Sequence, residues 1–259
     1  MPTSSADNTP ADDTLTDHAL AADLAKRAGD LLLALARREP PGAQRGKLGD
    51  RQSDDFLIEA LRRLRPADGL LSEETADSPD RLAKARVWII DPLDGTREYT
   101  EADRVDWAVH VALAVDGLAM VGAVALPAAG IVLCTGSPPV VPHPAQGQPL
   151  RLVVSRTRAP QLTSDVAKLL GAELIPMGSA GAKAMAVVLG RADAYVHAGG
   201  MYEWDSCAPV AVAAAAGLHV SRLDGSPLRY NQGDSWQPDL VLCRRQIAPR
   251  LLAAIAAVG

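Results

Sequence analysis

An apolar run that stops at two carboxylates constrains this chain more than any other feature. Residues 87–90 read Val-Trp-Ile-Ile, and residues 91–96 follow as Asp-Pro-Leu-Asp-Gly-Thr. A continuous apolar run of this length is typical of a strand buried on both faces. Pro92 fixes φ and removes a backbone donor, so we expect the strand to end at Asp91-Pro92. Asp91 and Asp94 are then predicted to point into the same space, with the Leu93 carbonyl between them.

Other acidic residues follow predicted elements in the same manner. The short apolar segment 69–71 ends at Ser72-Glu73-Glu74, and Asp205 follows Trp204 at the predicted start of a helix. Each feature alone is more typical of a surface turn or a helix cap. Their combination on apolar strands favours a site for Mg²⁺, which prefers oxygen ligands, and two adjacent divalent ions need carboxylates from separate elements.

Apolar spacing, capping residues and turn residues predict an α+β first half and an α/β second half that meet at a cleft. Residues 43–53 are polar and contain glycine, so we expect a loop there, and residues 137–149 contain five prolines and predict a linker. Asp116-Gly117 predicts a two-residue hairpin turn. Helices are expected from Asp17 to Pro40 and at 54–64, 160–170, 179–189, 205–216 and 247–257. Strands are expected at 69–71, 87–90, 107–115, 118–126, 130–134, 152–155, 173–176, 194–196, 218–222 and 239–243.

Charge and cysteine content exclude some classes of protein. The 259 residues carry a net charge of −5, which argues against a binder of nucleic-acid polymers or of membrane surfaces. The three cysteines are far apart and form no CxxC pair, so they predict neither a disulfide framework nor a zinc site. The longest apolar stretch, residues 109–133, is interrupted by polar residues, glycines and a proline, so no membrane span is expected. Residues 1–14 predict a loose tail without a secretory signal, and we expect a cytoplasmic location.

Taken together, Glu73-Glu74, the run from Trp88 to Thr96 and the pair Trp204-Asp205 resemble the inositol monophosphatase superfamily. The resemblance extends from about residue 17 to the end of the chain. It implies an αβαβα layered fold and a Mg²⁺-dependent, lithium-sensitive phosphomonoesterase with two or three ions. It also implies an N-terminal subdomain at 15–136 with most metal ligands, a C-terminal subdomain at 150–259 with Asp205 and substrate contacts, and a possible homodimer.

The resemblance carries over to individual residues. It implies that the metal ligands are Glu73, Asp91, Asp94, Asp205 and the Leu93 carbonyl. Glu73 and Thr96 are implied to activate the attacking water, and Gly95 and Thr96 to bind the phosphate, since a helix start presents free N–H groups. Asp54 is similar in position to a further catalytic acid, although Arg51 stands where the family has threonine.

Three segments are similar to the CysQ-type 3′(2′),5′-bisphosphate nucleotidases of the superfamily. They are Glu203-Trp204-Asp205, Gly178-Ser179 followed by Lys183, and the stretch from Asp224 to Asn231. This likeness implies removal of the 3′-phosphate from 3′-phosphoadenosine 5′-phosphate or from its sulfated relative, with Asp205 among the substrate contacts.

Two of these positions have an alternative interpretation. Lys183 is either part of a second anion site at the start of a helix or a solvated lysine on its flank. Tyr230 is either a substrate contact or packing beneath a turn. His110 and His197 have no obvious partners in the sequence, so no role is assigned to them.

Three other functions remain open. An inositol-phosphate phosphatase and a fructose-1,6-bisphosphatase would keep the metal site and differ only in the distal pocket. A non-catalytic protein that binds Mg²⁺ or lithium is the alternative of another class. Glu73 and Thr96 argue against the last, because a pure binder has no need of a threonine that activates water.

Overall fold

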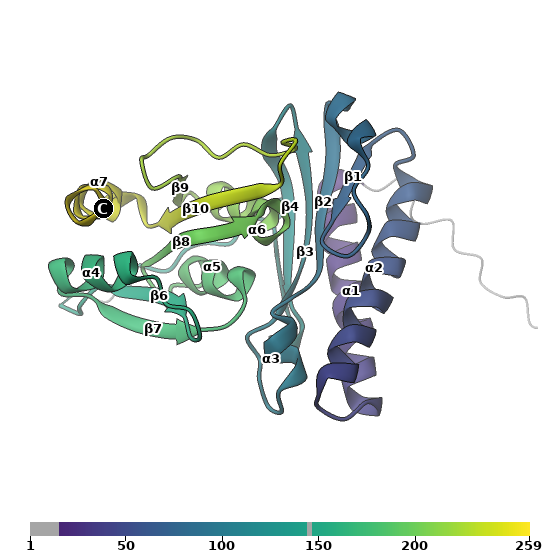
Figure 1. Ribbon diagram of the computed structural model, residues 1–259, viewed down its shortest axis with the longest axis horizontal. Helices are drawn as coiled ribbons and strands as arrows, with labels where there is room; N and C mark the ends of the chain where they lie inside the picture. The colour runs from purple at the N-terminus through teal and green to yellow at the C-terminus, as the bar shows by residue number, and fades with distance from the viewer. Residues whose placement is uncertain (1–15, 144–146) are drawn as a thin grey trace, which may run out of the picture.

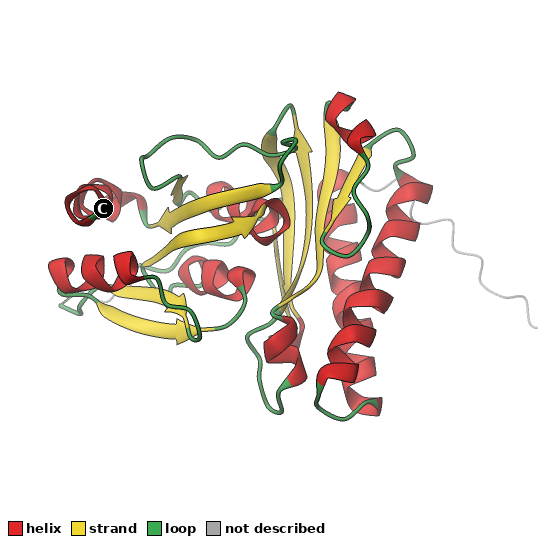
Figure 2. Ribbon diagram, viewed as in Figure 1, coloured by secondary structure: helices red, strands yellow, loops and turns green. Residues whose placement is uncertain are grey.

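The computed structural model describes residues 16–143 and 147–259. In these ranges the elements stack in five layers, alternately helical and sheet, which confirms the predicted αβαβα architecture (Figure 1). Figure 2 shows the helical layers in red on both sides of each yellow sheet. The predicted tail at 1–14 lies outside the described residues, and the predicted linker at 137–149 is described only in part.

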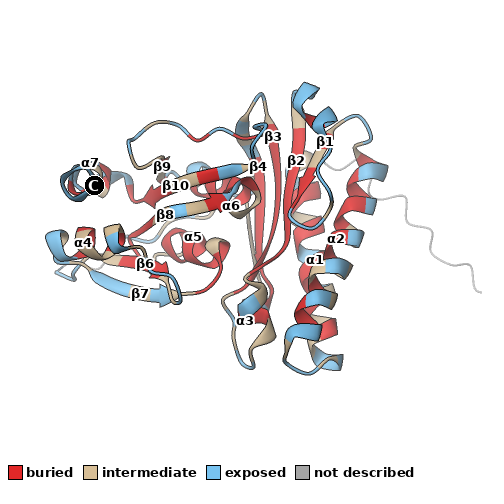
Figure 3. Cartoon of the chain, in the orientation of Figure 1, coloured by how far each residue is buried: buried red, intermediate tan, exposed pale blue. Residues whose placement is uncertain are grey.

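The first layer consists of two long helices, α1 (Asp17–Arg38) and α2 (Ala43–Leu64). Thr16 caps α1 by accepting a hydrogen bond from the Ala19 amide. The apolar faces of the two helices pack on one side of the first sheet, where Trp88 and Ile90 are fully buried. In Figure 3, buried residues line the sides of both helices that face this sheet.

The prediction of a loop at 43–53 was wrong, because these residues form the first half of α2. The glycines that suggested a loop are points of close packing. A Cβ at Gly46 would lie 2.8 Å from the side chain of Thr100, and one at Gly49 would lie 2.9 Å from that of Tyr99. Glycine therefore lets α2 lie close to the segment that follows the second strand.

The first sheet has the strand order β1-β2-β3-β4-β5. β1 pairs with β2 in parallel, and the other neighbours are antiparallel. The predicted hairpin turn is confirmed between β3 and β4, where Asp116 and Gly117 have φ of 49° and 75°. The strands are β1 (Gly69–Ser72), β2 (Arg86–Asp94), β3 (Ala108–Val115), β4 (Leu118–Leu126) and β5 (Ile131–Cys134), with short 3₁₀ helices η1 (Pro79–Ala83) and η2 (Pro127–Ala129).

The second sheet has the order β7-β6-β8-β10-β9. Helices α5 and α6 lie between the two sheets, and α4 and α7 cover the outer face of the second. β8 and β10 are longer than predicted, because each pairs with the other over most of its length. The elements are α3 (Thr96–Thr100), β6 (Arg151–Ser155), α4 (Gln161–Leu170), β7 (Glu173–Met177), α5 (Ala180–Val188), β8 (Ala194–Tyr202), α6 (Glu203–Ala215), β9 (His219–Ser221), β10 (Trp236–Cys243), η3 (Arg245–Ile247) and α7 (Ala248–Val258).

The central layer joins the two halves of the chain. α6 belongs to the second half but packs on β3 and β4 of the first sheet, and a single cluster of buried side chains extends from Leu71 to Leu242. In the described part of the chain, no helix is long and apolar enough to cross a membrane.

At Gly122, strand β4 lies against helix α6 with no room for a side chain. A Cβ there would lie 2.7 Å from the Ala211 side chain and 2.8 Å from the Ala208 carbonyl oxygen. We expect Gly122→Ala to lower the free energy of unfolding by about 1–3 kcal/mol, because overpacking forces backbone to move. Urea unfolding measures this change. Gly233→Ala is the matched control, since nothing lies within 4 Å of its Cβ, and equal stability of the two variants would contradict the prediction.

Candidate active site at an acidic cavity

The two carboxylates of β2 face the same side of the sheet because the strand contains a bulge. Strand β2 does not end at Asp91-Pro92 as predicted but continues to Asp94. Asp91 pairs with His110 and Asp94 pairs with Ala108, so three steps along β2 match two steps along β3. In a regular strand residues three apart point to opposite faces, and one extra residue reverses this. Pro92 has no N–H to donate to the ladder, which favours the irregularity here.

Leu93 lies in the bulge and makes contacts on both faces of the sheet. Its side chain is buried against α1 and α2. Its amide donates to Asp91 Oδ1 over 3.0 Å, which fixes that carboxylate, and its carbonyl oxygen lies 3.2 Å from Thr96 Oγ1. The bulge therefore positions the Asp91 carboxylate, the Leu93 carbonyl and the Thr96 hydroxyl together.

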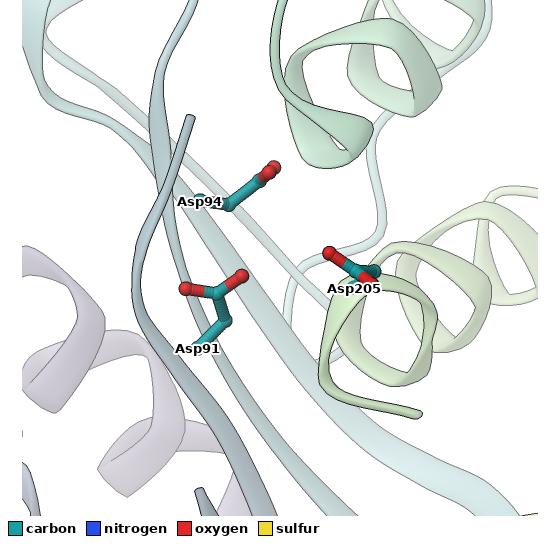
Figure 4. A group of neighbouring side chains, drawn as sticks. All are labelled: Asp91, Asp94 and Asp205. Carbon is teal, nitrogen blue, oxygen red and sulfur yellow. The ribbon is translucent and has the colours of Figure 1, made fainter. Parts of the chain in front are cut away.

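A third carboxylate comes from the central layer. Asp205 does not open α6 as expected but is its third residue, and it accepts a hydrogen bond from the Tyr202 amide over 2.6 Å. Asp91, Asp94 and Asp205 each offer an oxygen atom, and these atoms lie within 4.8 Å of one another. Figure 4 shows the three side chains directed toward a common space between β2 and α6.

Glu73 completes the acidic group from the end of β1. It lines the same cavity of about 540 Å³ as the three aspartates and Leu93, a volume typical of small-molecule sites. All five predicted metal ligands therefore border one cavity. Gly95, Thr96, Gly178, Ser179 and Lys183, which were predicted to bind substrate, line it as well.

The electrostatics of this group fit a cation site. Burial raises the pKa of Glu73 to about 8, with added repulsion from Asp205 and Asp94. Burial and Asp94 raise the pKa of Asp205 to about 6, and burial with Glu73 raises that of Asp91. Carboxylates held this close resist ionisation unless positive charge compensates them. An all-oxygen donor set of this kind suits a hard divalent cation such as Mg²⁺.

Asp94 differs from the other three carboxylates because neighbouring groups of the protein compensate its negative charge. It accepts hydrogen bonds from the Ser179 hydroxyl, from the Ala180 amide over 3.0 Å and from the Gly181 amide over 2.6 Å. Burial acts to raise its pKa, but His110, Ser179 and Lys183 bring it down to about 2. The N-terminus of α5, which we expected to hold a substrate phosphate, therefore holds the Asp94 carboxylate, since a helix start favours any anion.

Lys183 is neither solvated nor far from the metal cluster. Its side chain is buried at the cavity, Nζ donates to the Ser179 carbonyl over 2.6 Å, and it lies 5.3 Å from the centre of the Tyr195 ring. Burial lowers the pKa of Lys183. Because Asp94 occupies the start of α5, this ammonium group is the positive charge that the helix adds to the cavity.

His110 is a site residue that the sequence interpretation missed. Its ring is fully buried, Nδ1 donates to the Trp204 carbonyl over 3.0 Å, and Nε2 lies 3.2 Å from Asp94 Oδ2. Burial lowers its pKa, but the charge of Asp94 outweighs this and leaves the pKa raised. A Cβ at Gly181 would lie 2.0 Å from Nε2, so the glycine makes room for the ring. The available signal was a lone histidine within an otherwise apolar strand.

Asp50, and not Asp54, contacts the predicted water-activating threonine. Thr96 Oγ1 lies 3.1 Å from Asp50 Oδ1, and burial together with Glu74 raises the pKa of Asp50 to about 6. Asp54 lies one helical turn further along α2 and accepts hydrogen bonds from the hydroxyls of Ser72 and Thr75. Asp50 was overlooked because the segment around it was interpreted as a loop.

Tyr230 does not border the cavity. It is fully buried beneath the hairpin turn, its amide donates to the Gly117 carbonyl over 3.0 Å, and its hydroxyl lies 3.2 Å from Ser206 Oγ. The structure therefore gives it the packing role that was the alternative to substrate binding. Glu203 is likewise structural, since it accepts the Asn231 and Gln232 amides over 2.6 and 2.8 Å. His197 Nε2 donates to the Gly200 carbonyl over 2.8 Å.

The chain is similar to known proteins over nearly its whole length. The model of the inositol monophosphatase family matches residues 18–258. A Mycobacterium leprae protein named 3′-phosphoadenosine 5′-phosphate phosphatase is 51% identical over 259 residues, which cover 94% of this chain and 95% of that protein. The Escherichia coli 3′(2′),5′-bisphosphate nucleotidase CysQ is 28% identical over 82% of this chain and 93% of its own length.

Solved structures show the same arrangement of layers. CysQ from Bacteroides thetaiotaomicron, described as a bacterial member of the inositol monophosphatase family, has a TM-score of 0.72 at 25% identity. That match covers 87% of this chain and 96% of the other. Mycobacterium tuberculosis SuhB has a TM-score of 0.73 at 24% identity, over 93% of this chain and 96% of its own, which is a likeness in fold.

Proposed function

Because the chain belongs to the inositol monophosphatase family, we propose that it is a phosphomonoesterase that removes the 3′-phosphate of 3′-phosphoadenosine 5′-phosphate and yields AMP. The observation that carries the proposal is the convergence of Asp91, Asp94 and Asp205 at one cavity. The nucleotide substrate is supported by the 51% identity to a protein of that name, over nearly the whole of both chains. The sulfated relative of the nucleotide is the second substrate that we propose.

Magnesium is the cofactor that the donor set fits best, with two or three ions in all. We propose that the oxygens of Glu73, Asp91, Asp94 and Asp205 and the Leu93 carbonyl hold these ions. When bound, Mg²⁺ would polarise the phosphate oxygens and lower the pKa of a nearby water. Competition by lithium is part of the same proposal.

The chain's own groups would direct a water toward the phosphorus atom. Asp50 Oδ1 fixes the Thr96 hydroxyl, and the Glu73 carboxylate borders the same cavity and can accept the proton of the attacking water. Lys183 Nζ would supply positive charge to the bound phosphate, and Asp205, which lines the same cavity, would lie beside the leaving oxygen of the ribose. No covalent intermediate is needed.

The test is phosphate release at equal, sub-saturating concentrations of 3′-phosphoadenosine 5′-phosphate, inositol 1-phosphate and fructose 1,6-bisphosphate. We expect the nucleotide to be hydrolysed fastest with Mg²⁺, and addition of lithium or a chelator to stop the reaction. Faster turnover of the inositol or sugar phosphate would support the phosphatase activity but contradict the proposed nucleotide substrate. Absence of turnover with every substrate would favour a non-catalytic metal-binding protein.

Three further features are part of the proposal. We place the protein in the cytoplasm, as a homodimer, with subdomains at 15–136 and 150–259. The first sheet ends with β5 and the second begins with β6, which supports a division of the chain between them. Light scattering after gel filtration tests the dimer, because a monomer mass would contradict it.

A further inference from the structure

Two exposed aromatic side chains stand out because aromatic residues make up only 3% of the chain. Tyr202 is 46% exposed and Trp236 is 48% exposed, and in the described ranges no other tyrosine, tryptophan or phenylalanine is among the exposed large side chains. Both line the acidic cavity, together with Trp204. Large aromatic surfaces are normally buried, so their exposure at a single cavity indicates a binding surface.

The backbone arranges these three rings as one wall. Tyr202 is the last residue of β8 and pairs with Trp236, the first residue of β10, so both side chains project from the same face of the sheet. The Tyr202 and Trp204 rings are stacked, with centroids 4.7 Å apart and planes 11° apart. Beside them, a Cβ at Gly200 would lie 2.5 Å from Trp236 Nε1, so the indole lies against bare backbone.

This aromatic wall (Tyr202, Trp204 and Trp236) adjoins the acidic cluster directly. The backbone amide of Tyr202 donates to Asp205 Oδ2 over 2.6 Å, so a residue of the wall is bonded directly to a carboxylate of the cluster. A substrate whose phosphate binds among the carboxylates must extend the rest of its structure along the cavity. The wall offers that part of the substrate flat π surfaces and few charges, which suits a planar base rather than a polyol.

We propose that the aromatic wall is the nucleobase subsite, on which the purine of the substrate stacks. This inference rests on the proposed function, because it requires a nucleotide substrate. It explains why this aromatic surface stays uncovered in a chain whose other tyrosine, tryptophan and phenylalanine rings are buried, apart from the half-buried Phe56. It also assigns substrate selection to the end of β8 and the starts of α6 and β10, beside the groups that carry the reaction.

Trp236→Ala tests this subsite by comparing two substrates on the same enzyme. Loss of one stacking surface is expected to raise KM for 3′-phosphoadenosine 5′-phosphate about tenfold. KM for inositol 1-phosphate, which has no base, is expected to stay unchanged, as is kcat for both. Trp236→Phe keeps a ring and is expected to restore most of the affinity. Leu169→Ala, a 56% exposed residue of α4 outside the cavity lining, is the control for truncation of an exposed side chain.

The possible failures can be told apart. If wild type shows no preference for the nucleotide, the proposed function fails and the subsite fails with it. If wild type prefers the nucleotide and Trp236→Ala leaves KM for it unchanged, only the subsite is overturned. An equal loss with both substrates would indicate a structural role and would also overturn it. A variant that changes the mass in solution but not KM would instead identify the wall as a contact between copies of the chain.

Discussion

Asp94→Asn is expected to lower kcat/KM for phosphate release about 10²- to 10³-fold while the protein stays folded. The amide offers one oxygen in place of two and carries no charge, so the cluster loses the carboxylate that the chain itself keeps ionised. The Ala180 amide donates to Asp94 Oδ1 and the Gly181 amide to Oδ2, so the single oxygen of asparagine can keep one of these two hydrogen bonds. Steady-state kinetics with excess Mg²⁺, together with circular dichroism, separate lost activity from lost structure.

Asp193→Asn is the matched control for this variant. Asp193 is also a buried carboxylate, with Arg151 Nε at 3.1 Å and Arg244 Nε at 3.0 Å, but it does not line the cavity. Its loss is expected to lower the free energy of unfolding by about 3 kcal/mol, because the buried Arg244 guanidinium and the partly exposed Arg151 guanidinium lose their charged partner. Activity per folded molecule should be unchanged. Near-wild-type activity of Asp94→Asn would remove Asp94 from the set of metal ligands.

Asp50→Asn is expected to lower kcat about 10²-fold, the effect of removing a group that positions proton transfer. Asp50 Oδ1 lies 3.1 Å from Thr96 Oγ1, so the aspartate acts through the threonine that faces the cavity. KM should change little, since Asp50 itself is not part of the cavity lining. Measuring kcat and KM separately distinguishes this positioning role from a loss of substrate binding.

Asp54→Asn on the same helix gives the comparison. Asp54 contacts Ser72 and Thr75 in the structure, so its replacement is expected to affect stability more than kcat. If Asp54→Asn stops turnover and Asp50→Asn does not, the original assignment of Asp54 as the catalytic acid is correct. The opposite result supports Asp50 as the residue that positions the Thr96 hydroxyl.

The layered fold could be predicted because its elements carry strong local signals. The hairpin at Asp116-Gly117 follows from turn chemistry, and the helices closed by glycine follow from capping. The first half of α2 could not be predicted, because glycines are common in loops and Gly46 and Gly49 made the segment look like one. In the structure they instead allow a helix to pack closely against its neighbours. Only the neighbouring side chains, supplied by distant parts of the chain, determine which of the two applies.

At the site, the sequence identified residues better than it identified their partners. The carboxylates were recognised from Asp91, Asp94 and their neighbours, and the structure brings them to one cavity. The bulge that aligns them depends on pairing with β3, which the sequence of β2 alone does not specify. The contact of Asp94 with α5 depends on the arrangement of the two sheets, so the start of that helix was assigned to a phosphate.

The order of the elements along the chain has a consequence for biosynthesis. When the ribosome has made the first 150 residues, Glu73, Asp91 and Asp94 are present, but α5 and α6 are not. The nascent sheet then lacks the helices that cover its inner apolar face, and Asp94 lacks the amides that hold it. Catalytic competence therefore arises late in translation. A prematurely terminated chain would have no partial activity and would expose the apolar face of its sheet to chaperones and proteases.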